Sequence, residues 1–113
     1  LFAVARDEAG RAVACGAIVL ENDYGELKRM FTLPVLSGRG IAGRLLQYLE
    51  TEAASRGEHV VMLETGHLQS EAIGLYARFG YERPEPFGSY VEDPNSVFMQ
   101  STLPAFLRSS THA

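Results

Sequence analysis

The spacing of hydrophobic residues changes about a third of the way along the chain, and this change predicts two kinds of element. Up to residue 33, short apolar runs alternate with polar turns that contain glycine, which is typical of β-hairpins. Turns this short cannot hold a crossover connection, so neighbouring strands should pair antiparallel. The sequence therefore predicts three antiparallel strands, over residues 2–6, 11–20 and 26–33.

Beyond residue 40 the apolar residues recur every three or four positions, as they do on one face of a helix. This amphipathic helix should end at Gly57. The continuous apolar run 59–65 follows and predicts a strand buried on both faces. Because a helix connects them, this strand should lie parallel to the third strand. The positions that define the helical face are Ile41, Leu45, Leu46, Leu49 and Ala53.

The last part of the chain predicts one more helix and the end of the sheet. Ser70 is a candidate N-cap for a helix over 71–79, and Gly80 would end that helix. Tyr81 should begin a short strand, and the final strand should span residues 95–103. These elements predict an α+β fold, with a mixed, mostly antiparallel central sheet and flanking helices.

Length and composition narrow the class of protein. A chain of 113 residues, 46% hydrophobic and 21% charged, is long enough for one domain, 1–113, with a core of its own. The net charge of −4 argues against a nucleic-acid-binding protein, and no apolar run is long enough to span a membrane. A cytoplasmic protein fits these properties, and nothing in them excludes a homodimer.

Cysteine and histidine usage argues against two kinds of site. Cys15 is the only cysteine, so no internal disulfide is expected, and its apolar surroundings predict a buried side chain. The three histidines lack the spacing of metal ligands, so we expect no metal site.

Residues 38–43 are rich in glycine and stand where the strand pattern gives way to the helical one. Glycine tolerates positive φ angles and lets a ligand approach the backbone closely. The N–H groups of a helix's first turn lack intrahelical partners, and the helix dipole is positive there. This combination predicts a phosphate-binding loop, and four basic residues lie near it in the sequence: Lys28, Arg29, Arg39 and Arg44.

The same residues have the G-x-G-x-x-G spacing of a dinucleotide-binding turn, and Glu64 follows about 20 residues later, as that fingerprint expects. A dinucleotide turn, however, directly follows a buried, apolar strand. Here the preceding strand carries Glu26, Lys28 and Arg29, and residues 34–37 intervene. The setting therefore favours a different phosphate ligand.

Two motifs in this order resemble those of the GNAT superfamily of N-acetyltransferases. The first, LPVLSGRGIAGRLL, occupies residues 33–46 and resembles the family loop Arg/Gln-x-x-Gly-x-Gly/Ala between a strand and a helix. The second, AIGLYARFGY, occupies residues 72–81 and resembles the family's Tyr-x-x-x-Gly-Phe/Tyr at the end of a helix. The resemblance covers nearly the whole chain and implies that the family's first strand and helices precede Leu1.

The resemblance implies acetyl-CoA as the donor substrate, with its pyrophosphate on the backbone N–H groups of the glycine-rich loop. The pantetheine arm would pair with the third strand, as an added strand would. Two positions depart from the family pattern: Ser37 stands where Arg or Gln is usual, and Gln69 where many members have Asn. The residues assigned to acetyl-CoA in this way are Phe31, Thr32, Leu33, Ser37, Gly38, Arg39, Gly40, Ile41, Ala42, Gly43, Arg44 and Gln69.

Acetyl transfer to an amine needs a neutral amine, a stabilised oxyanion and a proton for the leaving thiolate. Glu26 resembles the acid that many family members place in this strand and is the candidate base; an exposed strand glutamate is the alternative. Tyr76 is the candidate acid, and packing beside Phe79 is its alternative role. Backbone N–H groups at Thr32 and Leu33 could serve the oxyanion.

Three functions fit these motifs. The resemblance favours an acetyl-CoA-dependent N-acetyltransferase that acts on a primary amine of a small molecule or protein. A non-catalytic acyl-CoA-binding regulatory module would share the loop and need neither Glu26 nor Tyr76. Dinucleotide binding comes third. The residues that could line an acceptor site are Glu64, Phe87 and Tyr90.

Overall fold

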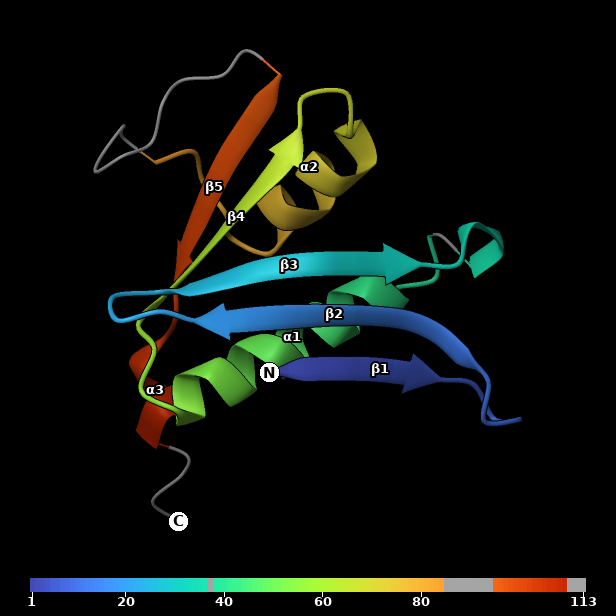
Figure 1. Cartoon of the computed structure of the whole chain (residues 1–113), viewed down its shortest axis with the longest axis horizontal. Coiled ribbons are helices and arrows are strands. Elements are labelled where there is room, and N and C mark those ends of the chain that lie inside the picture. The colour runs from blue at the N-terminus through green and yellow to red at the C-terminus, as the bar shows by residue number, and fades with distance from the viewer. Residues whose placement is uncertain (37, 85–94, 110–113) are drawn as a thin grey trace.

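A computed structural model describes residues 1–36, 38–84 and 95–109 of the chain. It shows a mixed sheet with helices packed on it, as the sequence predicts (Figure 1). In chain order the elements are β1 (Phe2–Arg6), β2 (Ala12–Leu20), β3 (Gly25–Thr32), the 3-10 helix η1 (Pro34–Leu36), α1 (Ile41–Ser55), β4 (Val60–Gly66), α2 (Ser70–Arg78), β5 (Ser96–Thr102) and α3 (Ala105–Ser109).

The strands lie side by side in their order along the chain, β1-β2-β3-β4-β5. All neighbours pair antiparallel except β3 and β4, which are joined through α1 and pair parallel. Both features confirm the expected topology, because short turns give antiparallel pairs and a helical crossover gives a parallel pair.

The core lies between the sheet and the two longer helices; in Figure 1, α1 crosses behind β2 and α2 lies beside β4. On α1 the predicted face is buried at Leu45, Leu46, Leu49 and Ala53, while Ile41 is half-buried. We call the face of the sheet that meets this core the helix face; Ile18 and Leu27 belong to it. The opposite face carries Val19 and Glu26, which are partners in the β2–β3 register.

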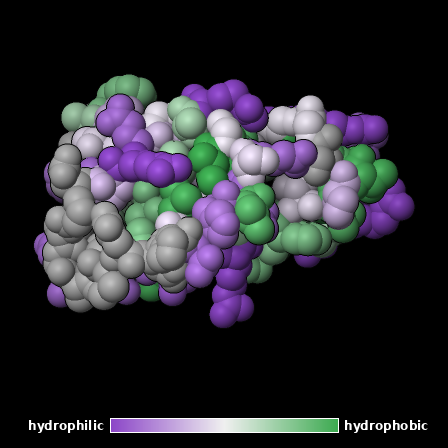
Figure 2. Space-filling view, turned by 90° about the horizontal axis from the view of Figure 1, so that it is seen from above, coloured by the Kyte–Doolittle hydropathy of each residue, from purple (hydrophilic) through white to green (hydrophobic). Residues whose placement is uncertain are grey.

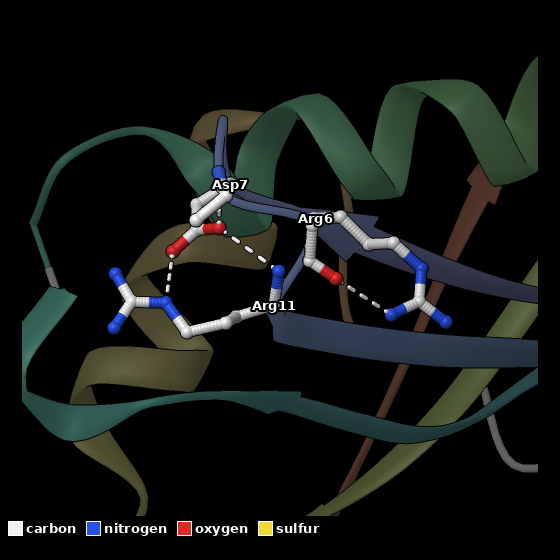
Figure 3. A network of polar contacts seen from close by, with 5 residues as sticks. Arg6, Asp7 and Arg11 are labelled. Atoms are coloured by element: carbon white, nitrogen blue, oxygen red, sulfur yellow. Dashed lines mark hydrogen bonds and ion pairs between the residues drawn. The ribbon is translucent and has the colours of Figure 1, made fainter.

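A network of polar contacts fixes the turn between β1 and β2 (Figure 3). The Asp7 carboxylate accepts bonds from the backbone N–H groups of Ala9 and Arg11 and from Nε of Arg11, at 2.8–2.9 Å. These donors, above all the Arg11 N–H, lower the pKa of the Asp7 carboxyl. Arg6 closes the turn from its other side by donating to the carbonyl of Gly10, whose φ of 83° is left-handed.

Three local expectations are corrected. Ser70 is not the N-cap of α2: that position is Gln69, whose carbonyl already accepts the first helical bond from the Ile73 N–H. Residues 81–84 form only an isolated bridge, between Glu82 and Gln100, rather than a strand beginning at Tyr81. Cys15 is half-buried instead of buried, because its side chain lies on the opposite face, away from α1.

Among the described helices none is long and apolar enough to cross a bilayer. In the same part of the chain no three histidine, cysteine or carboxylate side chains gather as a metal site would require.

Candidate acetyl-CoA site between two diverging strands

The parallel strands β3 and β4 pair over only three residues each, Gly25 to Leu27 with Val61 to Leu63. Beyond this point β4 stays paired with β5 as far as Gly66, and β3 continues beside β2 to Thr32. Figure 1 shows the two strands diverging towards their C-terminal ends. The edge of β3 from Lys28 onward is therefore without a β4 partner and can accept an extended ligand.

A bulge in β3 begins where the pairing with β4 ends. Between the pairs Ala17–Lys28 and Cys15–Phe31 the register shifts, so Arg29 and Met30 together oppose Gly16 of β2. Arg29 has φ of 59°, which is left-handed and uncommon for a residue with a side chain. The bulge bends β3 away from β4 and so contributes to the gap between them. No feature of the sequence alone indicated this bulge.

Near the end of β3, one of the two candidate oxyanion donors is engaged in the sheet and the other faces away from β2. The Leu33 N–H donates to the Val13 carbonyl at 3.0 Å, so it is already used. Because donors alternate in an antiparallel ladder, the neighbouring Thr32, paired with Ala14, turns its N–H away from β2. The Thr32 N–H thus points towards the unpaired edge. Phe31 lies on the opposite face and is 56% exposed.

The glycine-rich loop leads from η1 into α1 and presents backbone to open space. Gly38 and Gly40 have φ of 82° and 80°, and a Cβ at either residue would meet nothing within 4 Å. Gly40 is the N-cap of α1, and its carbonyl accepts the first helical bond from the Arg44 N–H. The first-turn N–H groups that precede Arg44 therefore have no intrahelical partner.

The charge around this helix end suits an anion. The first turn of α1 contains no acidic residue, and the exposed side chains of Arg39 and Arg44 flank it. A phosphate group placed there would meet the positive end of the helix dipole as well as these cations. Ser37, also assigned to the pyrophosphate from sequence, lies outside the described residues.

Gly43 has a different role from the other two glycines. A Cβ at this position would lie 2.5 Å from Cζ of Phe79, so Gly43 is the point of closest approach between α1 and the end of α2. Its N–H belongs to the first turn, but the need for glycine here is a packing requirement.

Hydrophobic residues lie beside the route into the loop. Val35 of η1 is 77% exposed and Leu33 is partly exposed. Figure 2, which is turned by 90° from Figure 1 so that the molecule is seen from above, shows hydrophobic residues at the end of the molecule where η1 lies, with hydrophilic residues around them. The loop thus borders both apolar surface and basic side chains.

Tyr76 is fixed by the way α2 ends. The N–H of Gly80, with φ of 91°, bonds to the Ala77 carbonyl, and the N–H of Tyr81 bonds to the Tyr76 carbonyl. This is a Schellman motif, and the hydrophobic contact that accompanies it is the Tyr76–Tyr81 ring pair, with centroids 5.7 Å apart. The Tyr-x-x-x-Gly-Tyr pattern is therefore a helix stop that locks the orientation of Tyr76.

The Tyr76 side chain is only 7% exposed and belongs to the core behind the sheet. Burial raises the pKa of its phenol, so the hydroxyl is protonated at neutral pH. Glu26 lies on the other side of the sheet, with its carboxylate 3.7 Å from Nζ of Lys28. The structure thus places the candidate acid and the candidate base on opposite faces, with the diverging strands between them.

Two of the remaining predicted site residues, Gln69 and Glu64, lie on the elements that border the gap. Gln69 is exposed at the start of α2. Glu64 is exposed on β4 just beyond the β3–β4 pairing and accepts a 3.4 Å bond from the Ser96 hydroxyl. Phe87 and Tyr90 lie outside the described residues.

Sequence analysis did not find a buried carboxylate beside the tyrosine pair. Glu50 of α1 accepts a 2.8 Å hydrogen bond from the Tyr81 hydroxyl, and both residues are buried. Burial raises the pKa of the Glu50 carboxyl, although the Tyr81 bond acts in the other direction, and the pKa of Tyr81 is raised as well. A signal was present: Glu50 follows Leu46 by four residues and so falls on the buried face of α1.

Comparison with known proteins agrees with this geometry. The sequence model of the acetyltransferase (GNAT) domain matches residues 1–83. An IAA acetyltransferase from Azospirillum brasilense is 44% identical over 104 residues, which are 90% of this chain and 67% of the relative. The uncharacterized N-acetyltransferase YsnE of Bacillus subtilis is 41% identical over 99 residues, 85% of this chain and 66% of the relative. The chain thus spans about two thirds of the length of each.

Solved structures show the same fold. A Klebsiella pneumoniae chain assigned to the acyl-CoA N-acyltransferases superposes with a TM-score of 0.83 at 44% identity, over 88% of this chain and 70% of that one. The PaiA N-acetyltransferase of Thermoplasma acidophilum, solved with coenzyme A, shares the fold with a TM-score of 0.78 at 18% identity, over 90% and 60% of the two chains. This chain belongs to the GNAT acetyltransferase family and is an acyltransferase by class.

Proposed function

We propose that this chain transfers an acetyl group from acetyl-CoA to a primary amine of a small molecule or protein by direct attack of the amine on the thioester. The observation that carries the proposal is the gap between β3 and β4, which ends at an open glycine loop on a helix N-terminus. An elongated ligand with phosphates at one end and amides along its arm is complementary to such a gap.

The pyrophosphate and the amide-bearing arm of acetyl-CoA would both bind to backbone groups of the chain. Its pyrophosphate would accept hydrogen bonds from the N–H groups between Gly38 and Gly43, with Arg39 and Arg44 beside them. The amides of the pantetheine arm would pair with the free edge of β3, as an added strand does. The thioester would then lie where the strands begin to diverge, near Glu26 on one face and Tyr76 on the other.

Each side chain would have one task in the transfer. Glu26 would take a proton from the attacking amine, directly or through a water. Thr32 lies four residues further along β3 than Lys28, about 13 Å at the rise of an extended strand, so its N–H would pair with an amide of the pantetheine arm rather than reach the thioester oxygen. Tyr76, a phenol that is protonated at neutral pH and whose pKa burial raises further, would supply a proton to the departing thiolate.

The test is transfer to a broad panel of primary amines, followed by thiol release, in the unaltered chain and in Glu26→Gln. Glutamine keeps the shape of the side chain but cannot act as a base, so kcat should fall by about 10²–10⁴. Acetyl-CoA affinity should be unchanged in the variant, since Glu26 lies away from the loop. Equal turnover by the two proteins would remove Glu26 from the mechanism. Acetyl-CoA binding without transfer to any amine would favour a non-catalytic acyl-CoA-binding module instead.

A further inference from the structure

Lys28 is the only lysine of the chain, and it stands directly beside the proposed base. Its Nζ lies 3.7 Å from Oε2 of Glu26. The two residues are two positions apart on β3, opposite Ala17 and Val19 of β2, so both side chains emerge on the face away from α1. Lys28 is also the first residue of β3 beyond its pairing with β4. An acceptor approaching Glu26 from this face must pass beside a fixed positive charge.

The pair is accessible to a ligand. The Lys28 side chain is 49% exposed and that of Glu26 is 28% exposed. An exposed ion pair of this kind contributes about 0–1 kcal/mol, so a ligand that offers each partner a better counter-charge can replace it. The pair has no net charge, and a simple ammonium ion at Glu26 would be repelled by Lys28.

An amino acid carries the matching charges on neighbouring atoms. Its ammonium group would face Glu26, and its carboxylate would face Lys28, whose compact charge and three donors suit a carboxylate in several orientations. Such a ligand replaces one ion pair by two. An amine without a carboxylate can satisfy only Glu26 and leaves Lys28 as a repulsive neighbour.

Apolar side chains surround the pair on the same face. Val19 is the β2 partner of Glu26 and is 42% exposed, and Ala17 is the partner of Lys28. Phe31, further along β3 and paired with Cys15, is also exposed on this side. Burying these surfaces against a ligand is favourable at roughly 25 cal/mol per Å², so the ligand's side chain should be apolar.

We propose, resting on the function proposed above, that the acceptor is a zwitterionic amino acid with an apolar side chain, selected by Lys28. The ammonium gives one proton to water, and the neutral amine forms a C–N bond to the thioester carbonyl while Glu26 takes a second proton. The C–S bond breaks, and the thiolate receives the Tyr76 proton. The products are the N-acetyl amino acid and CoA, and the side chains return to their starting states by proton exchange with water.

The experiment compares L-leucine with three acceptors that resemble it in size and each differ from it in one group. L-leucine, L-leucinamide and 3-methylbutylamine differ only in whether they carry a carboxylate, an amide or neither, and L-asparagine has the size of leucine with a polar side chain. We expect kcat/KM to be higher for leucine than for each of the other three by about tenfold or more, the ratio that 1.4 kcal/mol supplies. Leucinamide has the less basic amine, so simple reactivity at neutral pH would favour it over leucine.

Variants of Lys28 distinguish two roles for this residue: binding the carboxylate of the acceptor, or positioning the Glu26 side chain. Lys28→Met should lower kcat/KM about tenfold for leucine while leaving 3-methylbutylamine unchanged or improved, and Lys28→Arg should restore the preference. Arg11→Met is the control, because Arg11 also forms an exposed ion pair, with its side chain 80% exposed, but at the remote β1–β2 turn. An equal loss for all acceptors in Lys28→Met would overturn the proposal, as would a preference of the unaltered chain for leucinamide, 3-methylbutylamine or asparagine. Those results leave the acetyltransferase function standing, whereas absence of transfer to every acceptor would overturn both.

Discussion

The two family motifs both depend on glycine, but the structure uses glycine in opposite ways in them. In the loop before α1, Gly38 and Gly40 keep left-handed backbone surrounded by open space. At the end of α2, Gly80 is also left-handed, but it completes a helix stop that packs Tyr76 against Tyr81. The first motif leaves its backbone N–H groups free for a ligand. In the second motif the backbone N–H groups are bonded within the helix end and hold a side chain in place.

This difference indicates what each motif contributes to function. A cradle made of backbone N–H groups would bind phosphate whatever side chains surround it, so the proposed binding does not require the family's usual residues at Ser37 and Gln69. The helix stop binds nothing itself, and it acts by orienting the Tyr76 ring towards the core behind the strand gap. The comparison predicts that changes in the loop alter donor binding, whereas changes at the helix stop alter stability or the catalytic step.

The largest effect should come from removing the Tyr76 hydroxyl. Tyr76→Phe keeps the ring contact with Tyr81, so we expect a loss of about 10²–10⁴ in kcat at unchanged acetyl-CoA affinity, because the variant cannot protonate the thiolate. Tyr81→Phe is the matched control: it should keep kcat but destabilise the fold by about 1–3 kcal/mol, because Glu50 loses its donor. Steady-state kinetics and denaturant unfolding measure both. Full activity in Tyr76→Phe would leave Tyr76 with its packing role alone.

The next effect should come from the contact between the two motifs. Gly43→Ala would place a methyl group 2.5 Å from the Phe79 ring, and overpacking of this kind costs about 1–3 kcal/mol of the free energy of unfolding. Gly74→Ala is the control, because its Cβ would meet only Arg78 Nη1 at 4.0 Å; alanine should stabilise that helix by about 0.5–1 kcal/mol. Adding Phe79→Leu to Gly43→Ala should recover part of the loss. A stable Gly43→Ala would contradict the packing role of this glycine.

A smaller effect is expected in the loop itself. Gly40→Ala and Gly10→Ala should each cost about 1–2 kcal/mol of stability, since both residues have φ near 80° and open surroundings. Only Gly40→Ala should weaken acetyl-CoA binding, by about tenfold, because its methyl group would stand over the donors of α1. Ligand-induced shifts in melting temperature compare the two. If both variants bind acetyl-CoA equally well, the pyrophosphate does not lie on this loop.

The smallest effect concerns the pH dependence of folding. Burial raises the Glu50 pKa above its unfolded value of 4.5, so the folded state holds the proton more tightly and stability falls as pH rises from that value through the folded pKa. Glu50→Gln keeps an acceptor for Tyr81 and removes this fall, so its unfolding free energy relative to the parent should increase with pH. Glu21→Gln, at an exposed turn position, should not change the slope. Parallel pH profiles for Glu50→Gln and the parent would contradict this account.

Much of the fold followed from the sequence because hydrophobic spacing records burial directly. The period of α1 identified Leu45, Leu46 and Leu49 as core, and the run 59–65 identified the parallel central strand. Ser70 failed as a cap because the helix begins one residue earlier, on the Gln69 carbonyl. Cap positions depend on local geometry that composition does not determine.

The candidate site was less completely predictable. The loop and Tyr76 carry local motifs, so sequence located them. The left-handed Arg29 and the end of β3–β4 pairing depend on how three strands meet, and no local pattern encodes them. The Leu33 N–H is engaged by the Val13 carbonyl and the Thr32 N–H faces away from β2, and this likewise follows from register.

The most direct test of the central claim is a calorimetric titration of the chain with acetyl-CoA and, in parallel, with NAD. Both ligands carry a pyrophosphate, but only acetyl-CoA has the amide-bearing arm that fits the gap between β3 and β4. The account predicts saturable acetyl-CoA binding at one site and no comparable binding of NAD. Binding of NAD with indifference to acetyl-CoA would contradict it.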